Sequence, residues 1–294
     1  MASSCAPMPF LRLVLLASCA ALAACAARAG PRATPRLPAP AMTTGGPNTR
    51  GPWTVGPSYA TQGLTIATRA VVVISGDPAT RTDTITATLN ATYAWARTVR
   101  RRISGSLTSY RVAAGGGSSA VPAGLTLPRA FTAEEPPARG ALAFQLPAES
   151  SACADPALSA LQGLHDAWIP LPDTLHIGRE WSDTVRTLSC RDRLLLHGVS
   201  VRQFRVQRAD VENNRAVLLI DRRSKGQTTA SGEQFGEPVA LAGEQSGSMQ
   251  YVLDVASGRF LRGNGRSSLD LTFKSRRRNQ RVQQSTELSV TWTP

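Results

Sequence analysis

The three histidines are the first residues to consider for chemistry, because an imidazole can be a metal ligand or a general base. They are His165, His176 and His197, and none has a second ligand at a spacing typical of a metal site. The sequence has no Gly-x-Ser-x-Gly or Ser-x-x-Lys nucleophile motif. We therefore expect no enzyme, no metal ion and no cofactor. A hydrolase would need a cleft in which His176 or His197 meets a carboxylate and a nucleophile.

Acylation of a cysteine thiol is the second chemistry that the residues suggest. Met1 to Ala24 carry one charge, Arg12, followed by an apolar run of about a dozen residues. That run is too short to cross a ~30 Å bilayer as a helix and is typical of a secretory signal peptide, here residues 1–24. The run ends in Leu22-Ala-Ala-Cys25, which resembles the bacterial lipobox.

The lipobox predicts that Cys25 is diacylated and becomes the new N-terminus, with Cys19 as an alternative acceptor. Ala26 follows it where an aspartate would favour retention at the inner membrane. We therefore expect a protein anchored to the periplasmic side of the bacterial outer membrane. The alternative is ordinary cleavage after Ala27 or Ala29, which would give a soluble periplasmic or secreted protein.

Two cysteines remain in the body of the chain, Cys153 and Cys190. An even number of cysteines in an exported protein favours a disulfide. A redox or metal pair is the alternative, but no Cys-x-x-Cys motif accompanies them.

Positive charge dominates the composition, with 33 Lys and Arg against 20 Asp and Glu. An exported protein does not meet nucleic acid, so we expect no nucleic-acid partner. Arg276, Arg277, Arg278 and Arg281 form one basic cluster. They are either solvated charges at a strand end or a surface for anionic partners such as phospholipid head groups, lipopolysaccharide phosphates or acidic glycans.

The chain divides into three parts. Residues 25–60 are rich in Pro and Gly without periodicity and form a lipid-anchored tether. Residues 61–294 show repeated period-two alternation, which predicts a single antiparallel β domain. The clearest strand is Asp83–Trp95, and others are expected near these ranges: Leu64–Ser75, Val99–Val112, Leu194–Val206, Ala216–Asp221, Met249–Val255, Arg259–Phe273 and Val282–Trp292. A change of face between Val201 and Phe204 predicts a bulge.

One segment has helical spacing instead. Asp155 and Pro156 are typical of a helix start, and apolar residues recur at helical intervals as far as Trp168, before Pro170. We expect a short helix near residues 155–168 between two halves of the β structure. The fold class is mainly β: a curved antiparallel sheet or half-barrel, or two β-layers, with the helix on the concave side.

Two motifs carry a family resemblance. Leu171-Pro-Asp-Thr-Leu-His-Ile-Gly-Arg-Glu-Trp181 resembles an element of uncharacterised bacterial exported proteins in domain-of-unknown-function families, and Tyr251 to Arg262 resembles a later hairpin of theirs. Their architecture is similar to the half-barrel of the lipoprotein carriers LolA, LolB and LppX. The resemblance implies a binding protein that holds an apolar or lipid-like molecule, with these cavity candidates: Leu89, Tyr93, Trp95, Trp168, Leu269 and Leu271. The alternative is a structural envelope protein that uses its basic hairpins on anionic surfaces.

Overall fold

Eleven strands form one antiparallel sheet in the order β6-β5-β4-β3-β2-β13-β12-β11-β10-β9-β8. The computed structural model describes residues 47–56, 58–76, 80–97, 101–135, 140–145, 152–191, 194–234, 237–275 and 279–294. The sheet strands are β2 (Gln62–Gly76), β3 (Arg81–Trp95), β4 (Arg102–Ala114), β5 (Arg129–Glu134), β6 (Ala143–Phe144), β8 (Glu180–Arg191), β9 (Leu194–Glu212), β10 (Arg215–Gln234), β11 (Glu237–Asp254), β12 (Arg259–Lys274) and β13 (Asn279–Thr293). Two short strands, β1 (Trp53–Thr54) and β7 (Thr174–Leu175), pair separately.

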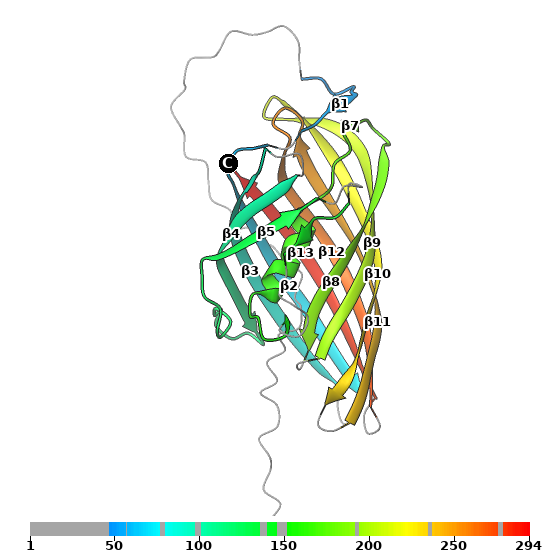
Figure 1. Cartoon of the computed structure of the whole chain (residues 1–294). Coiled ribbons are helices and arrows are strands. Elements are labelled where there is room, and N and C mark those ends of the chain that lie inside the picture. The colour runs from blue at the N-terminus through cyan, green and yellow to red at the C-terminus, as the bar shows by residue number, and fades with distance from the viewer. Residues whose placement is uncertain are drawn as a thin grey trace, which may run out of the picture.

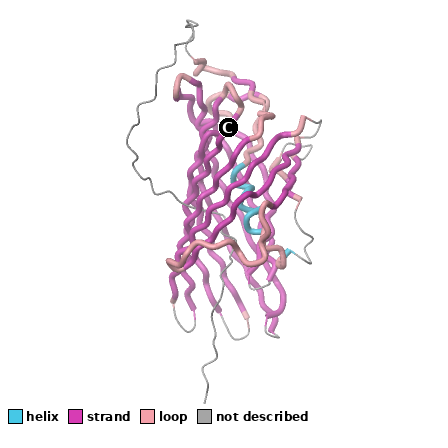
Figure 2. Tube along the Cα trace, turned by 90° about the vertical axis from the view of Figure 1, so that its left-hand side faces the viewer, coloured by secondary structure: helices cyan, strands magenta, loops and turns pink. Residues whose placement is uncertain are grey.

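The sheet curves into a half-barrel with one short helix on its concave side (Figures 1 and 2). The helix, α2 (Leu158–Gly163), continues as a 3₁₀ turn, η1 (Leu164–Ala167). The expected fold class is therefore confirmed, and one curved sheet rather than two layers is present. The helix starts a little later than predicted, and the Asp155 carboxylate accepts a hydrogen bond of 2.8 Å from the Ala157 N–H.

Period-two alternation holds along most strands. In β3, the residues Ile85, Ala87, Leu89, Ala91 and Tyr93 are buried while their neighbours face outward or are half-buried. The inward residues form two separate apolar clusters. The first packs the helix residues Leu161, Leu164 and Trp168 against the sheet. The second contains Ala70, Val72, Ile85, Leu194, Leu196, Ala230, Val239, Leu241, Leu271 and Val282.

The bulge predicted between Val201 and Phe204 is wrong. Strand β9 alternates without interruption there, because Arg202 is buried at 3% exposure and Val201 faces outward at 47%. The assumption that valine must face inward caused the error. The irregularity in this pairing occurs elsewhere, between Leu219 and Ile220 of β10.

Some strands have no counterpart in the sequence prediction. The clearest is β8, whose inward positions include Trp181, Asp183 and Thr187, so its apolar alternation is weak. Each predicted strand is present, although its bounds differ by a few residues in most cases. The largest difference is in β10, which extends to Gln234, well beyond the predicted Asp221.

The disulfide between Cys153 and Cys190 is confirmed, with a Cα–Cα distance of 5.4 Å. It joins the chain just before α2 to the edge strand β8. The predicted signal peptide, Cys19, Cys25 and residues 25–46 of the tether lie outside the described residues, as do Arg276, Arg277 and Arg278. The end of the predicted tether belongs to the folded domain, because Trp53 and Val55 are buried in the first apolar cluster and β1 pairs with β7.

Candidate functional site

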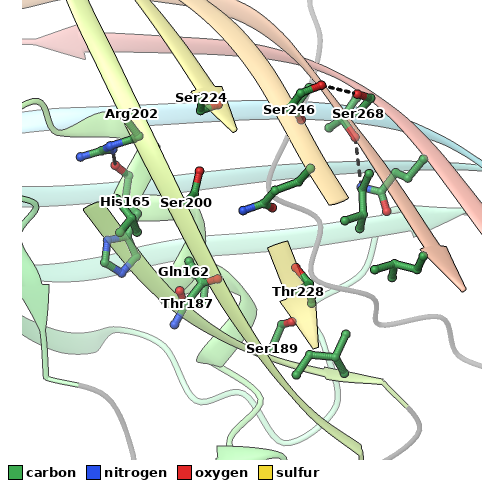
Figure 3. Close-up of a pocket in the computed structure, with 18 of the residues that line it drawn as sticks. Gln162, His165, Thr187, Ser189, Ser200, Arg202, Ser224, Thr228, Ser246 and Ser268 are labelled. Atoms are coloured by element: carbon green, nitrogen blue, oxygen red, sulfur yellow. Dashed lines mark hydrogen bonds between the residues drawn. The ribbon is translucent and has the colours of Figure 1, made fainter. Parts of the chain in front are cut away.

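A cavity of about 160 Å³ lies between the helical segment and the concave face of the sheet (Figure 3). Part of its wall is aliphatic: Val72, Val185, Leu188, Leu196, Leu269, Leu271 and Val282. The rest is polar: Gln162, His165, Thr187, Ser189, Ser200, Arg202, Arg222, Ser224, Thr228, Gln245, Ser246, Ser267, Ser268, Gln284 and Thr286. A β domain of this kind gains stability by burying apolar side chains, so this many polar residues on a concave wall need an explanation.

The strand register brings most of these polar side chains together. Arg202 of β9 stands opposite Asp183 of β8 on one side and Ser224 of β10 on the other. On the far side of the cavity, Ser267 of β12 stands opposite Thr286 of β13. Residues opposite one another in an antiparallel pair point to the same face. Polar residues from six neighbouring strands, β8 to β13, line this one space.

Arg202 of this wall belongs to a buried ion pair. Arg202 Nε and Nη2 donate to the two carboxylate oxygens of Asp183 at 2.8 and 2.5 Å, and their side chains are 4% and 0% exposed. Arg202 Nη1 also donates to the backbone carbonyl of His165 at 2.8 Å. The guanidinium therefore links β8 and β9 to the helical segment, and its three nitrogens all have protein partners.

Gln162 is a buried polar residue of the cavity wall whose side-chain amide has no partner in the described chain. It lies on α2, is 6% exposed and lines the cavity. Within the described chain, neither its amide nitrogen nor its amide oxygen has a hydrogen-bond partner. Leaving a buried polar group unpaired costs about 1–3 kcal/mol. Such groups are few in native proteins, so a molecule that binds in the cavity is a direct explanation.

Arg222 brings a second guanidinium to the cavity wall from β10. It is 5% exposed, and its Cζ lies 5.9 Å from the centre of the Tyr251 ring. A guanidinium at this distance from an aromatic face is stabilised by the ring quadrupole. This contact helps to hold a charged side chain beside the apolar cluster.

Two of the predicted cavity residues, Leu269 and Leu271, line this cavity. They contribute aliphatic surface beside the polar groups. Leu89 instead lies within the first apolar cluster at 3% exposure.

The three predicted aromatic residues lie together at another place. Tyr93, Trp95 and Trp168 line a small cavity of about 50 Å³, and the Tyr93 and Trp168 rings meet edge to face with centroids 5.1 Å apart. A space of that size holds a few water molecules at most. The helix therefore fills most of the apolar half of the concave face with its own side chains.

Tyr93 provides a pH test of this packing. Its hydroxyl donates to Gln62 Oε1 at 3.0 Å, and burial raises the pKa of the phenol above its usual range. A pKa raised by folding stabilises the protein below the unfolded pKa of about 10 and loses that contribution as the pH rises further.

We therefore expect the free energy of unfolding to fall above pH ~10 with a slope approaching 1.4 kcal/mol per pH unit from this group. The variant Tyr93→Phe should be less stable at neutral pH, because Gln62 loses its partner, yet it should show a shallower alkaline loss. Urea unfolding from neutral to strongly alkaline pH measures both. Equal slopes in the two proteins would contradict the assignment.

The predicted anionic surface is represented in the described chain by Arg281. Its Nε donates to Asp270 Oδ1 at 2.8 Å, and this guanidinium holds the pKa of the Asp270 carboxyl below its usual range. Asp270 thus compensates much of the charge that Arg281 would offer to an anionic partner.

The structure separates the three histidines. His165 lines the cavity and its ring lies 4.7 Å from that of Phe144. His176 is exposed, with Nδ1 3.1 Å from the Ile177 carbonyl, and His197 is exposed on β9. Among the described residues, no three His, Cys, Asp or Glu side chains are grouped so that they could hold a metal ion.

Sequence reasoning missed three residues that line the cavity, Gln162, Arg202 and Arg222, and it missed Asp183, the ion-pair partner of Arg202. One signal for Gln162 was available, because it lies four residues after Leu158 and three before His165. Residues at this spacing share a helix face, so Gln162 belongs to the stripe that the helix buries.

Comparison with known proteins places the chain in no family. No family model matches it, and no curated protein matches it. A solved structure, "Crystal Structure of Pseudomonas aeruginosa OccK8 (OprE)", aligns over 80% of this chain and 98% of that chain, at 4% identity and a TM-score of 0.23. A superposition of that quality does not establish a shared fold. Across the residues that the structure describes, no helix is both long and apolar enough to span a membrane.

Proposed function

We propose that this protein is a non-catalytic binding protein that holds a small molecule in the cavity between α2 and the sheet. The observation that carries the proposal is Gln162, a buried amide that lines a cavity of about 160 Å³ with both of its polar atoms unpaired in the described chain. A cavity that only maintained the fold would be more stable with an apolar residue at this position. The binding role explains why the chain keeps glutamine there.

The ligand in this proposal is a polar molecule rather than a lipid chain. The apolar half of the concave face is packed with side chains of the helical segment, among them Leu161, Leu164 and Trp168. The remaining space has hydroxyl, amide and guanidinium groups in its wall. Burying a lipid chain against these groups would leave them without hydrogen bonds, at a cost in free energy.

The proposal also includes export and anchoring. It rests on the apolar run after Arg12, on Leu22-Ala-Ala-Cys25 and on the Pro- and Gly-rich stretch that precedes β1. A chain of that composition is an extended, semi-rigid spacer. It would let a domain anchored at Cys25 stand away from the periplasmic side of the outer membrane.

Native mass spectrometry of the protein purified from the membrane of its own organism tests both parts. We expect a mature chain that begins at Cys25 with a diacylglycerol adduct, and a second, non-covalent mass of a small polar molecule that disappears on denaturation. An unmodified N-terminus would contradict the anchor. An acylated protein without any bound small molecule, even when extracted with the mildest detergents, would contradict the binding role.

A further inference from the structure

We propose that the cavity ligand is a neutral polyhydroxylated ring of monosaccharide size, recognised by the side-chain amide of Gln162. This inference rests on the proposed binding function and names the chemistry of its ligand.

The size of the cavity limits the ligand to a single ring. A cavity of about 150 Å³ in an engineered protein holds one benzene molecule, and this cavity is about 160 Å³. A hexopyranose has about twice the non-hydrogen atoms of benzene, so a single ring is the upper limit for this cavity, and a disaccharide or an acyl chain is far larger. The ligand is therefore no larger than a single ring and would lie between α2 and the sheet, among the residues drawn in Figure 3.

Gln162 determines what the ligand must offer. An amide presents a donor and an acceptor side by side, and both atoms of Gln162 are available in the described chain. A hydroxyl group both donates and accepts, so two adjacent hydroxyls satisfy the amide in either orientation. The serine and threonine hydroxyls of the wall, such as Ser224 and Thr228, are also able to donate or accept.

The ion pair favours a neutral ligand over an anion. An anion would be drawn to a guanidinium, but Asp183 already balances the charge of Arg202 and accepts two of its hydrogen bonds, and the His165 carbonyl accepts a third. No Asp or Glu is present among the described residues that line the cavity, so a cationic ligand has no partner there. Arg222 adds a second guanidinium to the wall. Because a guanidinium attracts anions, an anionic sugar is the probe that competes with the neutral polyols.

The aliphatic part of the wall also fits a sugar ring. Val185, Leu269 and Leu271 present hydrocarbon on the same cavity as the hydroxyl and amide groups. A pyranose has polar edges and C–H faces, so it can use both kinds of surface at once. A fully polar solute such as a small inorganic ion would leave this hydrocarbon in contact with a charge.

The test is isothermal titration calorimetry of the full mature protein with D-glucose, D-galactose, D-mannose and myo-inositol, together with D-glucuronate as the anionic probe and cyclohexanol as the apolar probe. We expect at least one neutral polyol to bind more tightly than the other two probes and to raise the thermal unfolding midpoint. The variant Gln162→Met keeps the side-chain volume but removes both hydrogen-bonding groups. It should weaken polyol binding by tenfold or more, while the unliganded variant is at least as stable as the wild type.

The matched control is Gln203→Met, at an exposed position of β9, which should change neither binding nor stability. Preferred binding of D-glucuronate or cyclohexanol, or polyol binding that Gln162→Met leaves unchanged, would overturn the ligand class but leave the binding function standing. Binding of no probe would overturn the ligand class as well, and native mass spectrometry then decides the binding function separately.

A crystal structure of the wild-type protein soaked in the best polyol gives a readout that does not depend on any variant. We expect a ring hydroxyl at about 2.7–3.2 Å from each amide atom of Gln162. Ordered water alone in the cavity at saturating polyol would overturn the inference.

Discussion

Asp183→Ala is expected to lower the free energy of unfolding by about 3–5 kcal/mol, because it leaves the buried charge of Arg202 without its counter-ion. The two side chains are 4% and 0% exposed, so water cannot replace the lost carboxylate without rearrangement. Arg202 also holds the His165 carbonyl, and its displacement would loosen the helical segment that covers the cavity. Urea unfolding followed by tryptophan fluorescence measures the change.

Two comparisons separate this effect from the general loss of a salt bridge. Asp270→Ala removes the carboxylate of the exposed pair with Arg281, whose side chains are 38% and 57% exposed, and should cost less than about 1 kcal/mol. The double change Asp183→Leu with Arg202→Met removes both buried charges and should recover most of the stability. Similar losses for Asp183→Ala and Asp270→Ala would show that the first pair is not buried in solution.

Removal of the disulfide should have an effect of similar size. Cys153 and Cys190 are 37 residues apart, and on the chain-entropy model a loop of that length contributes about 4 kcal/mol by restricting the unfolded chain. We expect Cys153→Ala with Cys190→Ala to lose about this much free energy of unfolding. The loss should appear as a lower urea midpoint.

A reductant provides the matched control for this second prediction. It should destabilise the wild-type protein to the level of the double variant and leave the double variant unchanged. The bond joins the start of the helical segment to β8, so polyol binding should weaken along with stability. An unchanged urea midpoint after confirmed reduction would contradict the stabilising role.

The fold was predictable where polarity alternates cleanly. In β3 the apolar residues from Ile85 to Tyr93 all occupy one face, and the period alone identifies a strand. Strand β8 was not predictable in the same way, because Asp183 and Thr187 occupy inward positions. The inward position of Asp183 in β8 makes sense only once its ion-pair partner on the neighbouring strand, Arg202, is known.

Most residues of the candidate site could not be predicted from the sequence. Its key side chains come from α2, β8, β9 and β10, and an ion pair such as Asp183–Arg202 joins residues on different strands. The alternation of β9 was misinterpreted at Val201 because a valine is normally the inward residue. Only the position of Asp183 shows that burying Arg202 instead is favourable.

The pairing of β2 with β13 has a consequence for how this chain is made. These strands are adjacent in the sheet from Gly63 opposite Thr293 to Gly76 opposite Gln280, although Ser75 and Arg281 are 206 positions apart in the sequence. A ribosome delivers β2 about 200 residues before β13, so two partial sheets with unpaired edges must wait for β13 to join them. Such edges are templates for aggregation, and distant pairings form slowly. The fifteen-residue strand β13 therefore completes the sheet during synthesis, and a chain that stops short of it leaves β2 and β12 as two unpaired edges.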